Sequence, residues 1–401
     1  MAMSNFIRKY IKGDQNIWVI IVFLALVSLL TVYSATGSLA YSTRGGNTTY
    51  FMFKQLSFLL VGIALIILVH HIPYKYFVIF SLPALYFSIL MLLVTLFSGQ
   101  NLNEASRWLE VPGIGLSFQP SEMAKLALLV YVARVLAQHQ REDAPTYGAF
   151  WPITIHTAIV CLLIFPENLS TSLLLGGVVF LMMYLGRVPF KNLFFTGLAG
   201  TAVVSLVLVL AMNDIVLFDR AETWATRIEN YFDDEAETNE YGSDYQVTQS
   251  KIAIATGGIF GKGPGNSDQR NFLPHPYSDF IFAIIAEEFG LIGAALVLGA
   301  YFFFLGRIGV LVRRSNRTFP AFMVLGLGLM LVIQAFVNMG VAVGIFPVTG
   351  QPLPLVSMGG TSILFTCLSL GAILSVSRHY QEQLQRQLAR EQNNENRQEA
   401  Q

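Results

Sequence analysis

Residues 261–290 read GKGPGNSDQRNFLPHPYSDFIFAIIAEEFG, and the interpretation of the whole chain starts from this stretch. A loop rich in Gly, Pro and polar residues ends at Asp279, and an apolar segment long enough to enter a lipid bilayer follows it. The sequence therefore places one carboxylate where water meets hydrocarbon. Such a position is costly for a charge without a role, so we expect Asp279 to be functional.

The composition of the chain is that of a polytopic membrane protein. Of its 401 residues, 54% are hydrophobic and 12% are charged, and the mean hydropathy is +0.56. The formal net charge is zero, whereas a nucleic-acid-binding surface needs a basic excess. Cys161 and Cys367 lie within apolar runs, where we interpret them as small buried hydrophobes. We therefore expect a membrane protein with no nucleic-acid partner.

Apolar runs predict an all-α fold of about ten transmembrane helices, since a span needs roughly 20 apolar residues. A large loop, 215–278, separates the seventh helix from the eighth. The transmembrane domain covers 1–380, and the polar tail 381–401 is expected to fray into disorder. The ten predicted spans are Ile17–Tyr33, Leu56–His70, Tyr74–Phe97, Ser121–Ala137, Phe150–Phe165, Ser170–Leu185, Phe190–Met212, Phe280–Val312, Thr318–Val343 and Leu355–Ser377.

The distribution of Lys and Arg predicts the orientation, because cationic short loops stay in the cytoplasm. With the N-terminus inside, the turns at Lys75, Arg141 and Arg187, the loop 313–317 and the C-terminal tail are all cytoplasmic. The loops 99–118, 215–278 and 344–354 are then external. The acidic run 233–237 in the second of these is most simply a solvated surface, with cation binding as the alternative.

Asp279 admits two interpretations. Ser278 or Asp279 is a natural helix N-cap, which would satisfy backbone amides and do nothing more. Alternatively, a carboxylate at the outer membrane surface could accept a proton from a substrate hydroxyl. Glu287 and Glu288 lie about 12 Å deeper at 1.5 Å per residue, so they cannot share a proton with Asp279. We expect those two glutamates to be paired structurally inside the bundle.

A second constellation comprises Arg107-Trp108 and the segment 119–125, which reads QPSEMAK. Pro120 suits a first helical turn, and Glu122 with Lys125 is an i,i+3 pair that could simply neutralise itself. The functional interpretation is that Arg107 and Lys125 give an external cavity the positive charge that a diphosphate requires.

Two broken segments are further candidates. Pro166-Glu167-Asn168 interrupts an apolar hairpin, a break that is tolerated at membrane depth where it lines a cavity. In the segment 350–362, GQPLPLVSMGGTS, Ser357 and the Gly359-Gly360-Thr361 run precede the last span. This segment is either a turn before a helix or an anion site at a helix N-terminus. No metal-ligand spacing is present, so we predict no metal held by protein ligands alone.

These blocks together resemble the SEDS family (shape, elongation, division and sporulation) along most of the chain. The resembling pieces are 105–108 (ASRW), 118–125 (FQPSEMAK), 166–171 (PENLST), 245–250 (YQVTQS), 257–263 (GGIFGKG), 279–283 (DFIFA) with Glu287-Glu288, and 353–362 (LPLVSMGGTS). Gly265-Asn266-Ser267 followed by Gln269 is more similar to division-type than to elongation-type members. Glu167 stands where an Asp is usual, Met358 where a Tyr is usual, and 275–278 (HPYS) replaces the common Glu-Ala-His-Thr, which changes the neighbours that would tune Asp279.

The resemblance implies a peptidoglycan glycosyltransferase that polymerises lipid II outside the bacterial inner membrane at the division septum. It implies as partners the undecaprenyl-linked nascent glycan, a class B penicillin-binding protein and divisome proteins, and a divalent cation (Mg²⁺ or Mn²⁺) could assist. Asp279 is the expected catalytic base. The expected substrate-binding residues are Arg107, Trp108, Gln119, Glu122, Lys125, Glu167, Ser357, Gly359, Gly360 and Thr361.

Three alternatives stay open at this point. The first is an elongation-type polymerase, the second a flippase for lipid-linked precursors, and the third a non-enzymatic scaffold for cell-wall synthases. A transporter should carry its charges near the bilayer midplane, whereas the charges here cluster toward the external face.

Overall fold

A computed structural model describes residues 12–98, 100–102, 105–110, 117–140, 145–213, 215, 220–232 and 243–399. The described chain is mainly helical. Its helices are α2 (Gln15–Ala35), α3 (Gly37–Arg44), α4 (Thr48–His70), α5 (Tyr74–Ser98), α6 (Pro120–His139), α7 (Phe150–Ile164), α8 (Leu169–Leu185), α9 (Phe190–Met212), α10 (Ala221–Phe232), α11 (Ser243–Gly257), α12 (Ile281–Arg314), α13 (Thr318–Ala342) and α14 (Thr361–Glu399), with short 3₁₀ turns at Tyr147–Ala149 and Gln269–Asn271.

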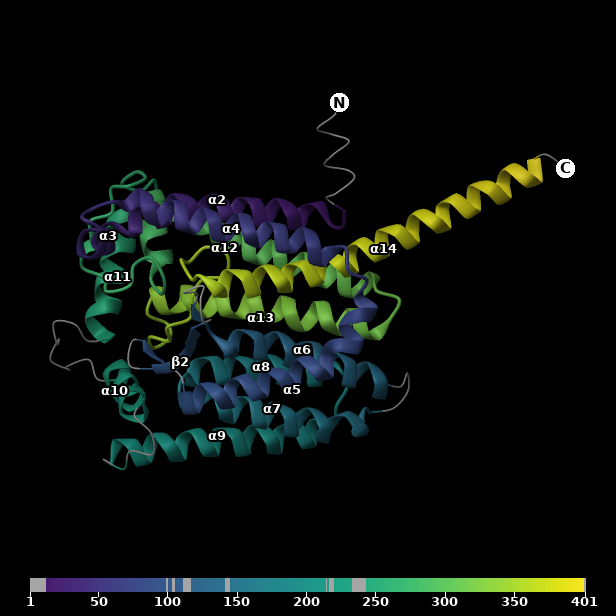
Figure 1. Cartoon of the computed structure of the whole chain (residues 1–401), viewed down its shortest axis with the longest axis horizontal. Helices are drawn as coiled ribbons and strands as arrows, with labels where there is room; N and C mark the ends of the chain where they lie inside the picture. The colour runs from purple at the N-terminus through teal and green to yellow at the C-terminus, as the bar shows by residue number, and fades with distance from the viewer. Residues whose placement is uncertain are drawn as a thin grey trace.

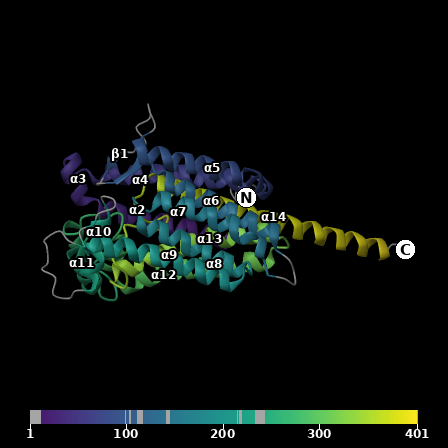
Figure 2. The same ribbon diagram turned by 90° about the horizontal axis from the view of Figure 1, so that it is seen from below.

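The long helices run side by side between two ends of the molecule (Figure 1). One end carries α3, α10 and α11, and we call it the loop end. The other end carries the start of α2 and the point where α14 leaves the bundle, and we call it the terminal end (Figures 1 and 2). There the Gly13 amide donates to the Gln381 side chain at 3.2 Å and the Gln381 side chain donates to the Gly13 carbonyl at 3.0 Å, which joins the segment before α2 to α14.

Eight of the described helices are long and apolar enough to cross a membrane, which confirms the predicted helical membrane fold. The helix α8 is apolar but has only 17 residues. The helix α6 has 20 residues, but Glu122, Lys125 and Arg134 lie within it. Both helices nevertheless run alongside the others, so the count of ten spans stays a prediction.

Three regions depart from the predicted boundaries. The loop 99–118 contains a small antiparallel sheet, with β1 (Gln100–Leu102), β2 (Ala105–Glu110) and β3 (Ser117–Phe118) in the order β1-β2-β3. The loop 215–278 contains α10 and α11. The last span begins at Thr361 rather than at Leu355, because Leu355 and Gly360 have positive φ angles and cannot continue a helix.

The irregular backbone at 350–357, inside the bundle, is held by polar side chains from neighbouring helices. Asn338 and Gln334 of α13 donate to the carbonyls of Gln351 (2.8 Å) and Pro352 (2.9 Å). In addition, Tyr301 donates to the Pro354 carbonyl (2.6 Å), and Ser28 donates to that of Val356 (2.8 Å). Non-helical backbone persists at membrane depth only where such partners replace water, which explains why these polar residues occur in otherwise apolar helices.

The start of α12 is fixed by the loop that precedes it. Glu287, fully buried, accepts from Lys262 (2.6 Å), from Ser267 and from the amide of Asp268 (3.1 Å). Glu288 accepts from Ser34 of α2, which in turn accepts from Arg270. These contacts agree with the structural role predicted for the two glutamates.

Two local predictions concern the cysteines and the tail. Cys161 and Cys367 are both free, and Cys367 is buried against Gly62 where α4 and α14 approach closely. The tail beyond Gln381 continues as helix to Glu399 with mostly exposed side chains. The disorder expected in this tail stays a prediction.

Candidate active site

Asp279 lies at the loop end, two residues before the start of α12, and is partly exposed. Phe280 is the N-cap of α12, and the cap makes no side-chain hydrogen bond. The Asp279 carboxylate instead accepts a hydrogen bond from the Ser278 hydroxyl at 2.9 Å. The capping interpretation is therefore wrong, because the carboxylate satisfies no helix amide.

The backbone around Asp279 is held against the 344–360 segment. The Asn338 amide donates to the Asp279 carbonyl at 2.8 Å as well as to that of Gln351. The Ser357 hydroxyl donates to the Ser278 carbonyl at 2.6 Å, and the Met358 amide donates to that of Tyr277 at 2.9 Å. Ser357 therefore contacts the site at the main-chain carbonyl of the residue before Asp279.

Gly350 leaves space beside the carboxylate. Its φ is +65°, a conformation that favours glycine, and a Cβ built on it would lie 3.7 Å from Asp279 Oδ2. One carboxylate oxygen is therefore engaged by Ser278, while the other faces a stretch of backbone that has no side chain.

The turn between α7 and α8 joins the same segment. The Asn168 side chain caps α8 by accepting from the Thr171 amide at 3.0 Å. The Gln351 amide donates to the Thr171 hydroxyl at 2.8 Å and lies 3.5 Å from Asn168 Oδ1. The predicted break at 166–168 is thus confirmed. Gln351 connects it to the segment that also contacts the backbone around Asp279.

Arg227 of α10 was missed by the sequence analysis. It donates to the Val348 carbonyl at 3.1 Å and is close enough to Asp279 to interact electrostatically with it. Burial lowers the pKa of the Arg227 guanidinium, as does Arg220, while Asp279 raises it. No local sequence signal marks Arg227, because its position depends on how α10 packs, with Trp224 against Phe165.

Tyr277 also responds to the Asp279 charge. Burial raises the pKa of the Tyr277 phenol, and the nearby Asp279 carboxylate raises it further. Its hydroxyl lies 3.4 Å from His275 Nδ1. Tyr277 therefore stays protonated at neutral pH, as a neutral hydrogen-bonding group in the loop before the carboxylate.

Glu122 and Lys125 form the predicted pair, with 2.7 Å between Oε1 and Nζ and with side chains only 11% and 6% exposed. They line a narrow cavity of about 20 Å³ with Gln334, whose amide holds the Pro352 carbonyl. Asp279 is not among the residues lining this cavity. The pair is thus connected to the 344–360 segment, but the structure does not place Lys125 beside the carboxylate.

Gln119 and Glu167 meet in a separate cavity, also of about 20 Å³, which Asn168 lines as well. The predicted substrate-binding residues therefore fall into three clusters, at Asp279, at Glu122 and at Glu167. The 344–360 segment contacts the residues around all three.

The remaining predicted residues are only partly described. Arg107 and Trp108 belong to β2, but their side chains lie outside the described part of the chain. Gly359 and Gly360 precede α14, and the buried Thr361 hydroxyl has no hydrogen-bond partner among the described residues. Anion binding there stays a prediction.

The metal predictions are not tested by the geometry. Within the described ranges, no group of three or more His, Cys, Asp and Glu residues gathers as a metal site. The acidic run 233–237 lies outside those ranges. Assistance by Mg²⁺ or Mn²⁺ stays a prediction.

Comparisons with known proteins agree on one family. Residues 14–382 match the family model FTSW_RODA_SPOVE, described as cell cycle protein. A probable peptidoglycan glycosyltransferase FtsW of Saccharophagus degradans is 34% identical over 92% of this chain and 94% of its own length. A protein of the same name from Halomonas elongata is 32% identical over 90% of this chain and 89% of its own.

Solved structures share the fold along most of the chain. A chain from a study of how a peptidoglycan synthase complex coordinates polymerisation and crosslinking aligns with a TM-score of 0.70 and 26% identity, over 92% of this chain and 98% of that one. The rod shape determining protein RodA of Thermus thermophilus aligns with a TM-score of 0.65 and 25% identity, over 91% and 97%.

Proposed function

This chain belongs to the FtsW, RodA and SpoVE family of cell cycle proteins, and from that premise we propose that it is a peptidoglycan glycosyltransferase that polymerises lipid II during cell division. The similarity to proteins named FtsW, at 30% to 34% identity over most of the chain, supports the division role over the elongation role of RodA.

In the proposed reaction, Asp279 acts as the general base. The 4-hydroxyl of the acceptor sugar attacks the anomeric carbon of the lipid-linked glycan, and its proton passes to the Asp279 carboxylate. The bond from the anomeric carbon to the diphosphate breaks, and its electron pair leaves with undecaprenyl diphosphate. The configuration at the anomeric carbon inverts.

The observation that carries this assignment is how few bonds the Asp279 carboxylate makes to the described part of the protein. It caps no helix and forms no ion pair within the described residues, whereas Glu122 and Glu287 are both held in ion pairs. Gly350 leaves space beside it. A carboxylate fixed by its backbone but open at one oxygen suits proton transfer.

The leaving diphosphate needs positive charge, because negative charge develops on it in the transition state. We assign that role to Lys125 and Arg107, with Glu122 orienting Lys125 through their 2.7 Å contact. Arg227 adds a positive charge near the carboxylate. In this proposal, the substrate or a conformational change brings these groups together, since Asp279 is not among the residues that line the cavity with Lys125.

The finer placement also belongs to this proposal. The protein lies in the bacterial inner membrane at the septum, with both termini cytoplasmic and the loop end external, where lipid II is consumed. A class B penicillin-binding protein would crosslink the product, a pairing supported by the match to a chain from a peptidoglycan synthase complex.

The decisive experiment is polymerisation of lipid II by purified protein in detergent, with and without the cognate transpeptidase. Asp279→Asn keeps the shape and removes the basicity, so we expect the rate to fall by about 100-fold or more. Asp268→Asn is the matched control, because Asp268 is an exposed carboxylate of the same loop and pairs only with Lys262. It should polymerise at the normal rate.

Two results would contradict the proposal. If the Asp279→Asn protein polymerised lipid II at the normal rate, Asp279 would not be the general base. The flippase alternative would be favoured if the wild-type protein made no polymer with its transpeptidase but transported lipid II in vesicles. A flippase shows no activity in detergent, because there is no membrane to cross.

A further inference from the structure

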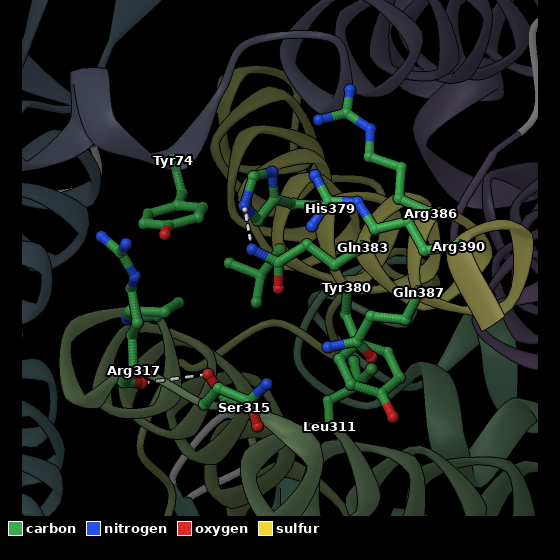
Figure 3. Close-up of a pocket in the computed structure, with 13 residues that line it drawn as sticks. Tyr74, Leu311, Ser315, Arg317, His379, Tyr380, Gln383, Arg386, Gln387 and Arg390 are labelled. Atoms are coloured by element: carbon green, nitrogen blue, oxygen red, sulfur yellow. Dashed lines mark hydrogen bonds between the residues drawn. The ribbon is translucent and has the colours of Figure 1, made fainter. Parts of the chain in front are cut away.

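The terminal end holds a cavity that the proposed reaction does not use. It has a volume of about 290 Å³, against about 20 Å³ for the two narrow cavities near the candidate active site. It lies where α14 leaves the bundle, between the end of α12, the start of α13 and the start of α5 (Figure 3).

The rim of this cavity is strongly basic. Arg317, from the loop before α13, lies on one side of the opening, and Arg386 and Arg390 of α14 lie on the opposite side (Figure 3). Arg317 and Arg386 act electrostatically on His379 between them, as does Lys75. Three arginines thus line one opening, and Lys75 adds positive charge nearby.

The positive charge is not neutralised within the described part of the chain. No described carboxylate forms an ion pair with Arg317, Arg386 or Arg390. Glu382 is near His379, but it is already paired with Arg378 at 2.9 Å and with Lys12 at 3.5 Å. The first amides of α13, beginning at Thr318, add the positive end of a 25-residue helix.

The inner wall of the cavity is apolar. Leu311, Pro320 and Val376 line it, together with the ring of Tyr74, which packs edge-on against His379 at 4.9 Å between centroids. A basic rim above an apolar wall at the end of a membrane bundle suits an amphiphile whose charged head carries phosphate and whose tails remain in the bilayer.

We propose that this cavity binds the phosphate-bearing headgroup of an anionic membrane lipid. Arg317, Arg386 and Arg390 bind the phosphate oxygens, and Leu311 and Val376 contact the glycerol and first acyl carbons. Because Arg386 and Arg390 belong to the part of α14 beyond the bundle, the bound lipid fixes that part against the loop before α13.

The chain offers a matched control for the charge alone. Arg313 and Arg314 end α12 at the same face of the membrane and are exposed, but they do not line the cavity. Arg317→Gln/Arg386→Gln and Arg313→Gln/Arg314→Gln each remove two positive charges. All four side chains lie at the surface, so neither double variant should disturb folding, and the melting temperature in lipid-free detergent checks this.

The experiment is native mass spectrometry of the full-length protein in detergent, titrated with dioleoyl-phosphatidylglycerol or with dioleoyl-phosphatidylcholine. We expect the wild-type protein to retain the anionic lipid preferentially. Arg317→Gln/Arg386→Gln should weaken that binding roughly tenfold or more, and Arg313→Gln/Arg314→Gln by about twofold at most.

Three outcomes would overturn the inference. Equal loss in the two double variants would mean that the lipid responds only to net charge at this face. Equal retention of the two lipids by the wild-type protein would remove the anionic requirement. Displacement of phosphatidylglycerol by a few millimolar inorganic phosphate would assign the cavity to soluble anions.

Discussion

At the scale of single residues, Arg227 is the least expected part of the candidate site. It is 52 positions from Asp279 in the sequence, yet the two side chains interact electrostatically, and its guanidinium holds the Val348 carbonyl of the neighbouring segment. We infer that Arg227 is a positioning residue, which places a positive charge near the carboxylate and fixes the segment that carries Gly350.

The substitution Arg227→Gln tests this role. We expect kcat for lipid II polymerisation to fall about tenfold, which corresponds to about 1.4 kcal/mol of lost transition-state stabilisation. Arg227→Lys keeps the positive charge and a donor for the Val348 carbonyl, so it should restore most of the lost rate. Glu222→Gln, an exposed change on the same helix, is the control. A lack of rescue by Arg227→Lys would leave Arg227 with a purely structural role.

Residues whose partners are near in sequence were predicted from the sequence, and residues whose partners are distant were not. The spacing of Glu122 and Lys125 predicted their ion pair, because an i,i+3 pair needs only a helix. The capping role considered for Asp279 was wrong, because the N-cap of α12 is Phe280, one residue after Asp279. Arg227 could not be placed, since its position depends on how α10 packs on the α7–α8 turn.

At the scale of elements, the candidate site depends on a tight packing of the turn after α11, residues 257–263, against a kink in α12. Gly290 has a φ of +68°, and a Cβ built on it would lie 2.3 Å from the Ile259 carbonyl oxygen. Gly261 is equally confined, with a built Cβ 2.2 Å from the Glu288 carbonyl oxygen. This close backbone contact keeps Lys262 above Glu287 and thereby orients the start of α12.

The substitution Gly290→Ala should therefore be severely destabilising. We expect a loss of more than about 3 kcal/mol, from the positive φ and from overlap with backbone that cannot move aside. Gly299→Ala in the same helix meets nothing within 4 Å and should be neutral, or stabilising by up to about 1 kcal/mol. The melting temperature of each variant in detergent measures the difference, and similar values for both would show that the kink is not required.

The elements also show where sequence patterns cease to be informative. Apolar runs predicted the long helices because a bilayer demands a continuous stretch of apolar residues. The same reasoning extended the last span back to Leu355, although the polar side chains of α13, α12 and α2 hold 350–357 as irregular backbone. Nothing local to that segment reveals those distant donors.

At the scale of the whole molecule, the two ends of the helix bundle carry different candidate sites. The candidate active site lies at the loop end, where segments distant in sequence meet around the 344–360 segment. Arg317, Arg386 and Arg390, which have no ion-pair partner among the described residues, line the cavity at the terminal end for which we propose a lipid. The positive-inside rule predicts that the terminal end faces the cytoplasm. Both the proposed polymerisation and the lipid site depend on that orientation.

Single cysteines test the orientation and the number of spans together, in a variant with Cys161 and Cys367 replaced by Ala. A membrane-impermeant maleimide on cells with a permeabilised outer membrane should label Asp268→Cys, but should label Asn316→Cys only after lysis. Tyr147→Cys tests whether α6 is one of the spans, because the exposed Tyr147 lies between α6 and α7. If α6 spans the membrane despite its charges, Tyr147 lies inside with Asn316. If α6 does not span, Tyr147 is labelled from outside, and the Glu122–Lys125 pair no longer belongs to a transmembrane helix.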